Sequence, residues 1–305
     1  MLLPENENAN TIEGKRLITG VFRVPRSAMS DQHHSLTDRT VVISGASRGI
    51  GFAIALAAAR HGANIVLLAK TADPHPKLPG TVHTAAAEVE AAGGRAAAVV
   101  GDVRKEEDVR RVVDIAVQRF GGIDLCVNNA SAIATESTER LSVKKFDLMQ
   151  DINIRGTFLL TQACLPHLRE AANPHVLTIA PPVNTNPRWL GAHPAYTLSK
   201  YGMTLLSQGW AAEFADAGIG FNCLWPQTYI ATSAVANLPD AERQLASARS
   251  PQIMADAALA IVTQPAKQVT GNCFVDVDAL TLYAGVDDFT PYGGGDNPTP
   301  DMFLD

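Results

Sequence analysis

The chain has 305 residues, of which 46% are hydrophobic and 18% charged, and its formal net charge at pH 7 is −6. This apolar content can fill the core of one large α/β domain, and the acidic charge argues against nucleic acid as the main partner. The four cysteines are scattered without a C-x-x-C pair, so they predict neither a metal site nor a disulfide framework, and we expect a cytoplasmic protein. No apolar run reaches the about 20 residues that a membrane span needs, so no membrane partner is expected.

Residues 1–36 are polar, carry mixed charges and show no hydrophobic periodicity. We predict a flexible N-terminal extension over 1–36 and a single folded domain over 37–305. Within that domain, β-branched apolar runs alternate with stretches of helical composition. Strands are predicted at 40–43, 63–68, 96–100, 123–127, 175–179, 220–224 and 272–277, and helices at 52–60, 81–92, 106–120, 146–168 and 195–215. This alternation predicts an α/β fold with a doubly wound, Rossmann-type sheet of seven parallel strands.

The turn after the first predicted strand is rich in glycine, and the next predicted helix follows it directly. Glycines let the backbone turn tightly and approach a ligand closely, and a helix N-terminus offers free N–H groups to a phosphate. We therefore predict a dinucleotide site at this turn. Its cofactor contacts are expected from Ser44, Gly45, Ser47, Arg48, Gly49, Ile50 and Gly51.

Tyr196 and Lys200 are four residues apart at the start of a predicted helix, which places them on the same face. A free tyrosine has a pKa of about 10 and is a poor acid or base near neutral pH. A neighbouring ammonium group favours the phenolate and lowers that pKa, so the phenol can exchange a proton with a carbonyl or alcohol oxygen. This pair is therefore the candidate for proton transfer.

The glycine turn (G-x-x-x-G-x-G), the Asn-Asn-Ala sequence at 128–130 and the Y-x-x-x-K pair follow one another in this order. They resemble the motifs of the short-chain dehydrogenase/reductase family, and the resemblance covers residues 40–277. It implies that Tyr196 is the catalytic acid/base and that Lys200 holds the nicotinamide ribose and lowers the tyrosine pKa. It also implies that Asn153 anchors a water molecule in the proton relay.

One position departs from the family pattern. Members usually have a serine after the fifth strand, which donates a hydrogen bond to the substrate oxygen. Here Ala180 or Pro181 takes that place, and no serine lies between residues 176 and 198. Losing such a donor can cost about 10²–10³ in rate. Ser131 and Asn184 are the candidate replacements, and we favour Ser131 because its strand end should face the nicotinamide.

Two cations favour NADP over NAD as the cofactor. Sites specific for NAD place an acidic residue after the second strand to bind the ribose 2′-hydroxyl. This sequence instead has Lys70 there and Arg48 in the glycine turn, which suit the additional phosphate of NADP. By resemblance, Asp102 is expected at the adenine, and the remaining cofactor contacts are expected from Val103, Asn129, Ile230 and Thr232.

Together these features predict an NADP(H)-dependent oxidoreductase that transfers a hydride between the nicotinamide and a carbonyl or alcohol group. The Ala-, Leu- and Val-rich segment 228–259 is expected to cover a pocket for an apolar substrate, such as a fatty, terpenoid or sterol-like molecule. The alternative is a cofactor-binding regulator or scaffold whose catalysis is weak because the serine is absent.

Residues 70–81 and 303–305 resemble one branch of the family whose animal members carry a further sterol-carrier domain. No such domain follows in this sequence, so lipid-carrier function is not expected. Family members commonly pair through the helices that match 146–168 and 195–215, so a homodimer or homotetramer is expected.

Overall fold

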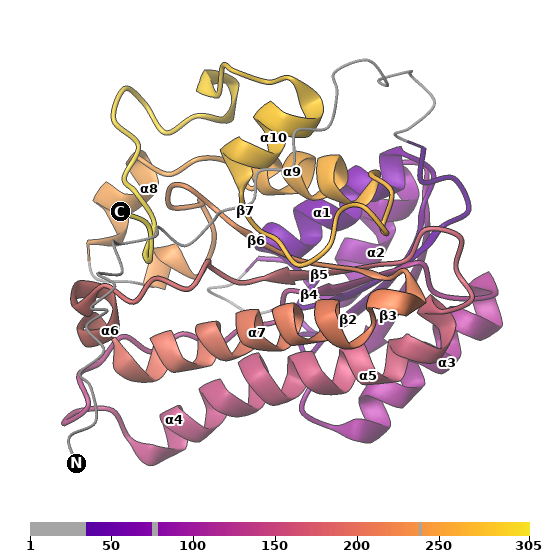
Figure 1. The fold of residues 1–305 in the computed structure, drawn as a ribbon, viewed down its shortest axis with the longest axis horizontal. Helices are drawn as coiled ribbons and strands as arrows, with labels where there is room; N and C mark the ends of the chain where they lie inside the picture. The colour runs from indigo at the N-terminus through magenta and orange to yellow at the C-terminus, as the bar shows by residue number, and fades with distance from the viewer. Residues whose placement is uncertain (1–34, 75–78, 238–239) are drawn as a thin grey trace, which may run out of the picture. The chain divides into compact units, whose positions relative to one another are not determined.

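A computed structural model describes residues 35–74, 79–237 and 240–305, so nearly all of the predicted N-terminal extension lies outside the described residues. Seven strands form one sheet in the order β3-β2-β1-β4-β5-β6-β7, and all neighbours are parallel (Figure 1). The strands are β1 (Thr40–Ser44), β2 (Asn64–Ala69), β3 (Arg95–Val100), β4 (Leu125–Asn128), β5 (His175–Ile179), β6 (Gly220–Trp225) and β7 (Cys273–Val275). The predicted doubly wound sheet is therefore confirmed.

Helices cover both faces of the sheet (Figure 1). One face packs against α1 (Gly49–Arg60), α2 (Val82–Ala91), α9 (Gln252–Val262) and α10 (Asp276–Ala284). The other packs against α3 (Glu106–Phe120), α5 (Gly156–Leu168) and α7 (Pro194–Glu213). The shorter helices are α4 (Val143–Met149), α6 (Pro187–Ala192) and α8 (Ala241–Ala246).

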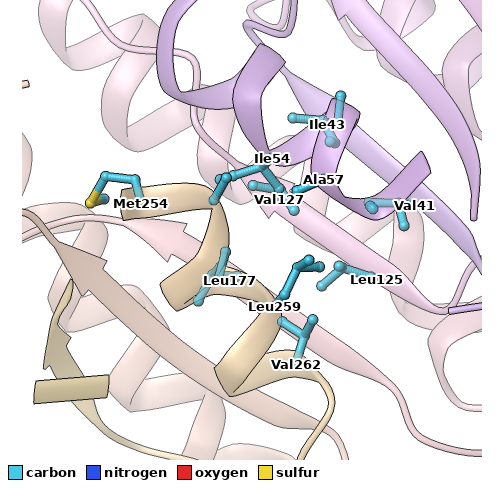
Figure 2. Close-up of a cluster of buried hydrophobic side chains, with 14 of the residues drawn as sticks. Val41, Ile43, Ile54, Ala57, Leu125, Val127, Leu177, Met254, Leu259 and Val262 are labelled. Carbon is cyan, nitrogen blue, oxygen red and sulfur yellow. The ribbon is translucent and has the colours of Figure 1, made fainter. Parts of the chain in front are cut away.

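The apolar composition of the strands follows from burial on both faces. In β1, Val41 and Ile43 join the hydrophobic cluster under α1 and α9, while Val42 between them joins the cluster under α3 and α5. Figure 2 shows the first cluster, in which Ile54 of α1 and Leu259 of α9 lie over the strand residues. Because successive side chains of a strand point to opposite faces, a strand covered on both sides must be apolar throughout.

Besides small shifts in the bounds of other elements, the structure differs from the predicted elements in three places. The predicted helix 146–168 is interrupted by a π-helical turn at Gln150–Arg155, between α4 and α5. The predicted last strand ends at Val275, because Asp276 begins α10 and its carboxylate accepts the N–H groups of Gln227 and Val277. Residues Pro187–Ala192, for which no strand or helix was predicted, form α6.

The segment 228–259, expected to cover a pocket, ends in α9, whose residues from Ile253 onward pack in the core. In the parts of the chain that the structure describes, no helix is long and apolar enough to cross a membrane. Nor do three or more His, Cys, Asp or Glu side chains of those parts group so that they could hold a metal ion.

The sheet topology fixes where a ligand site can form. The chain turns in opposite directions from β1 and from β4, which are neighbours at the centre of the sheet. In such sheets the crevice lies at the carboxyl ends of the strands, at this point of reversal. The glycine turn follows β1 and Asn129 follows β4, so both lie at the mouth of this crevice.

Candidate active site

The turn between β1 and α1 packs closely against the residues that follow β4. Asn129 donates from its amide nitrogen to the carbonyl oxygens of Ser44 at 3.0 Å and Gly45 at 3.1 Å. A Cβ atom at Gly51 would lie 2.3 Å from that same nitrogen, so no larger residue fits there. Gly45 has φ +69°, and a Cβ atom there would lie 2.9 Å from Cα of Ala130. These contacts explain why the turn needs glycine at both positions.

Helix α1 begins at Gly49, three residues earlier than predicted, so its first turn lies within the glycine motif. Arg48 holds the N-cap position in extended conformation, and its side chain makes no capping hydrogen bond. That side chain reaches the carbonyl oxygen of Gly80 at 2.9 Å instead, and its buried Nε finds no partner among the described residues. The N-terminus of α1 is uncapped and carries the positive end of the helix dipole, and the glycines let the backbone come close to a ligand. Both features suit the pyrophosphate of a nicotinamide cofactor.

A cavity of about 440 Å³ lies next to this turn. It brings together nine of the residues predicted for the site: Gly45, Arg48, Gly49, Ile50, Asn129, Tyr196, Lys200, Ile230 and Thr232. Its remaining wall is largely apolar and includes Ile133, Ile179, Trp225, Pro226, Tyr229, Val235 and Met302. The predicted phosphate turn and the predicted proton-transfer pair therefore share one cavity.

Tyr196 and Lys200 lie one turn apart on α7, and both are buried. The Lys200 ammonium group donates to the carbonyl oxygen of Ile179 at 2.9 Å, and it lies 5.3 Å from the ring centre of Trp225. Burial lowers the pKa of Lys200 to about 8.

The expected lowering of the Tyr196 pKa is wrong for this structure. Burial raises the pKa of Tyr196 well above its ordinary value, and the charges of Asp301 and Tyr229 raise it further. The physical reason is that desolvation penalises a phenolate in this enclosed site, while the Lys200 ammonium is bound to a backbone carbonyl.

Asn153 lies in the π-helical turn and is fully buried. Its amide group exchanges two hydrogen bonds with the backbone of Ala132, at 2.8 and 3.0 Å, and donates a third to Ser199 Oγ at 2.9 Å. Ser199 Oγ in turn donates to the carbonyl oxygen of Tyr196 at 2.8 Å. Asn153 therefore ties the segment after β4 to the helix that carries Tyr196.

The two candidates for the missing serine have different positions. Ser131 lines the cavity, and its exposed side chain makes one long hydrogen bond, 3.5 Å to the carbonyl oxygen of Ala132. The amide nitrogen of Asn184 donates instead to the carbonyl oxygen of Phe303 at 3.1 Å and to the carboxylate of Asp305 at 2.9 Å. Asn184 is therefore occupied in holding the end of the chain.

Lys70 and Asp102 lie at the ends of β2 and β3 and form an ion pair of 3.2 Å. Arg104 also binds the Asp102 carboxylate, with Nη2 at 2.6 Å from Oδ2, and this hydrogen bond holds the pKa of Asp102 well below its usual range. The side chain of Val103 packs against the start of α5, where a Cβ atom on Gly156 would lie 2.7 Å from it. The side chain of Val103 therefore contributes to the core, and its role as a cofactor contact remains a prediction.

The last residues of the chain form a wall of the cavity that no sequence motif indicates. We call residues 299–305 the C-terminal segment. Asp301 and Met302 line the cavity, and the buried ring of Phe303 lies 6.1 Å from the ring of Tyr196 and 5.9 Å from that of Trp225, between centres. Residues 303–305 stood out in the sequence, but nothing there indicated which part of the fold they would contact.

The family model described as short chain dehydrogenase matches residues 39–243. The chain therefore belongs to the short-chain dehydrogenase family, the class that this fold and cavity define. Within it, the chain is similar to hydroxysteroid dehydrogenase-like protein 2 of Danio rerio, with 51% identity over 268 residues that cover 87% of this chain and 64% of that protein. It spans about 64% of the length of this curated relative. A crystal structure of a putative dehydrogenase from Xanthomonas campestris is similar with 49% identity and a TM-score of 0.84, covering 89% of this chain and 99% of that one.

Two more distant family structures name their cofactors. A short chain dehydrogenase from Mycobacterium paratuberculosis bound to NAD is 25% identical, with a TM-score of 0.67 over 79% of this chain and 97% of that one. An L-sorbose reductase from Gluconobacter frateurii, complexed with NADPH and L-sorbose, is also 25% identical, with a TM-score of 0.70 over 80% of this chain and 96% of that one.

Proposed function

We propose that this protein is an NADPH-dependent reductase that converts a carbonyl group of an apolar substrate into an alcohol. The observation that carries the proposal is the shared cavity, in which Tyr196 and Lys200 face the same space as the glycine turn. This arrangement favours an enzyme over the alternative of a binding protein without catalysis. When bound, the nicotinamide would supply the hydride for the carbonyl carbon.

Tyr196 would supply the proton for the carbonyl oxygen. Because burial raises the pKa of its hydroxyl, the phenol keeps its proton at neutral pH. A protonated phenol can act as the acid in carbonyl reduction, whereas alcohol oxidation would need the phenolate as a base. Solvent would then return the proton to Tyr196. In this state the phenol can serve as the proton donor, although its raised pKa makes it a weaker acid than an ordinary tyrosine.

Lys200 and Asn153 would position the reacting groups. Lys200, held by the carbonyl oxygen of Ile179, would bind the ribose hydroxyls of the nicotinamide nucleotide. Asn153 would keep the strand end after β4 and the backbone of Tyr196 at a fixed separation through Ser199. Its predicted water-anchoring role remains a prediction.

The preference for NADP rests on Lys70 and Arg48. The Lys70 side chain is 60% exposed, while Arg104 already satisfies its partner Asp102, so the Lys70 ammonium can turn to a 2′-phosphate at little cost. Relatives bound to NAD and to NADPH both exist in the family, so the family alone does not decide this choice. The adenine would lie against the ends of β2 and β3, beside Asp102.

The apolar wall of the cavity supports an apolar substrate, and so does the similarity to a protein named for hydroxysteroid dehydrogenases. We also propose a homodimer or homotetramer built on α5 and α7, because both carry exposed apolar side chains, Phe158 on α5 and Leu198 and Leu205 on α7. A cytoplasmic location remains part of the proposal.

The first test compares wild type with Tyr196→Phe on a panel of fatty, terpenoid and steroid ketones and aldehydes. NADPH oxidation is followed by its absorbance. Removing the proton donor should lower kcat by about 10²–10⁴, while the dissociation constant of NADPH, measured by its fluorescence, stays within twofold. The Tyr283→Phe change on α10, at a half-buried tyrosine outside the cavity, serves as the matched control. Wild type that binds NADPH and reduces none of these compounds would contradict the proposal.

A further inference from the structure

The C-terminal segment is fixed to the cavity by backbone pairing. Thr228 and Pro300 form an antiparallel bridge, Tyr229 N donates to the carbonyl oxygen of Thr299 at 3.0 Å, and Asp301 N donates to that of Gln227 at 3.0 Å. Trp225 Nε1 adds a bond to the carbonyl oxygen of Met302 at 3.0 Å. This short pairing continues directly from the end of β6, so it places Asp301 at the cavity wall in a defined register.

The carboxyl group of Asp301 is an unusual feature in an apolar wall. The residue is 8% exposed, and it lines the cavity together with Tyr196 and Lys200. Met302 N donates to its Oδ1 at 2.6 Å, and no cation among the described residues lies within ion-pair distance of it.

The charged and titratable groups around Asp301 come from three elements. Tyr196 and Lys200 face it from α7, Tyr229 from the segment after β6, and Asp276 from the start of α10. Burial, aided by the Asp276 charge, raises the pKa of Asp301 to about 7, while the hydrogen bond from Met302 N–H and the Lys200 charge oppose the rise. A carboxyl group in this setting still binds a proton at pH values between about 4 and 7, where an ordinary aspartate is ionised.

We propose that Asp301, as a protonated carboxylic acid, donates a hydrogen bond to the substrate oxygen beside the Tyr196 hydroxyl, and so replaces the serine that this chain lacks. The inference rests on the proposed function. In the reaction the hydride goes to the carbonyl carbon and the Tyr196 proton to the oxygen, while Asp301 keeps its own proton. An ionised Asp301 would instead repel the negative charge that develops on the oxygen.

The geometry favours Asp301 over Ser131 for this role. Both line the cavity, but the Ser131 side chain is exposed and its Oγ contacts the neighbouring backbone. A donor that is already shielded from water interacts more strongly with a developing oxyanion than one that remains hydrated. Asp301 also lines the same cavity as Tyr196, the proposed proton donor.

The test compares Asp301→Asn and Asp301→Ala, with the exposed Asp296→Asn change as the matched control. Asparagine keeps the size and a donor but cannot ionise. We expect wild-type kcat for ketone reduction to fall up to tenfold per pH unit above about pH 7. Asp301→Asn should lose that slope and stay within about tenfold of wild type at pH 6, while Asp301→Ala should lose about 10²–10³ in kcat. Because the Asp301 charge raises the pKa of Lys200, the pH profile of Asp296→Asn provides the reference in which both groups titrate as in wild type.

A second measurement does not depend on turnover. The native state binds a proton at Asp301 that the unfolded chain releases between its ordinary carboxyl pKa and about 7, so wild type loses stability as pH rises through this range. The melting temperature of wild type should therefore fall by about 5 °C relative to that of Asp301→Asn between pH 5 and pH 8. Parallel curves for the two proteins would overturn the proposal.

The outcomes distinguish a failure of the proposed role of Asp301 from a failure of the proposed reductase function. Wild-type activity in Asp301→Ala, or a loss in Ser131→Ala with none in Asp301→Ala, would overturn the role of Asp301 and leave the proposed function intact. A wild-type pH slope that persists in Asp301→Asn would do the same. If wild type reduces no carbonyl compound although it binds NADPH, the proposed function fails, and the role of Asp301 fails with it.

Discussion

Asn129 shows how one side chain positions the phosphate-binding turn. Its amide nitrogen bonds to two carbonyl oxygens of the turn, and it occupies the space that a side chain at residue 51 would need. The hydroxyl of Ser44 accepts the N–H groups of Asn129 and Ala130, both at 3.1 Å, from the opposite side. The turn is therefore built before any ligand arrives, which lowers the ordering cost of binding a dinucleotide.

We expect the charge of a single side chain near the adenine ribose, that of Lys70, to determine whether NADP or NAD binds better. Lys70→Glu should repel a 2′-phosphate and accept a hydrogen bond from a free 2′-hydroxyl. We expect KM for NADPH to rise at least about tenfold while KM for NADH falls, as measured from initial rates with each cofactor. The same charge reversal at the exposed Lys144 of α4 is the control. Equal changes with both cofactors would show that Lys70 does not face the 2′ position.

The C-terminal segment is the element that completes the cavity. Phe303 is 2% exposed and packs among the rings of Trp189, Tyr196, Tyr201 and Trp225, with centre distances of 5.2–6.1 Å. Polar contacts fix the residues around it, including the Trp189 Nε1 bond to the Asp305 carboxylate at 3.0 Å. Trp189 belongs to α6, so this bond joins the end of the described chain to that helix. The segment therefore links α6, α7 and the end of β6.

Removing the Phe303 ring tests this link. Phe303→Ala should lower the free energy of unfolding by about 3–5 kcal/mol, because a large buried side chain is lost and a cavity is left beside Tyr196. Urea denaturation followed by tryptophan fluorescence measures the loss. Leu190→Ala on α6, where the side chain is 42% exposed, is the control and should cost under about 1 kcal/mol. A similar small loss for both variants would mean that the segment is not packed as described.

At the scale of the whole molecule, α5 and α7 present apolar side chains to the outside. Phe158 is 40% exposed, Leu198 54% and Leu205 60%, and the two leucines lie two turns apart on one face of α7. A group of exposed apolar side chains on one side of a domain is typical of an interaction surface. Since most homo-oligomers are symmetric, the same helices of a second copy are the natural partner.

The proposed assembly predicts the effect of a charge on this surface. Leu205→Glu should reduce the molar mass of the assembly, because the same substitution is buried in every copy of a symmetric interface. Size-exclusion chromatography with light scattering measures the mass. Leu282→Glu on α10, at 43% exposure, is the control and should leave the mass unchanged. An assembly of unchanged mass in Leu205→Glu would place the interface elsewhere.

The pH dependence of stability is also a property of the whole molecule. His175 at the start of β5 is 1% exposed, its Nε2 lies 3.0 Å from the carbonyl oxygen of Gln264, and burial lowers its pKa to about 4. The unfolded chain binds a proton at this residue below about pH 6.5 and the native state does not, so stability falls as pH drops from 6.5 to 4.

Comparison with His175→Asn isolates this effect, because all other titrations are common to both proteins. The difference in the free energy of unfolding between wild type and variant should shift by about 3 kcal/mol against wild type between pH 7.5 and pH 4. Urea denaturation at several pH values provides the measurement. A pH-independent difference would show that His175 titrates normally in the folded protein.

The local elements of this protein could be predicted from the sequence because their signals are local. The strand 175–179 and the helix 106–120 were predicted with the bounds that the structure gives. The pairing of Tyr196 with Lys200 follows from helical spacing, and the meeting of the glycine turn with Asn129 follows from the order of a doubly wound sheet. Periodicity and topology thus determined the fold and most of the cavity residues.

Only the tertiary structure decided the environment of those residues. The proton affinity of Tyr196 depends on burial and on Asp301, which is more than one hundred residues away in the chain. The same holds for two other contacts that no motif predicts. Asn184 donates a hydrogen bond to the C-terminal segment, and Arg104 forms an ion pair with Asp102. A sequence pattern predicts which side chains lie on one face of a strand or helix. The solvation and protonation of those side chains depend on which other parts of the chain pack against them.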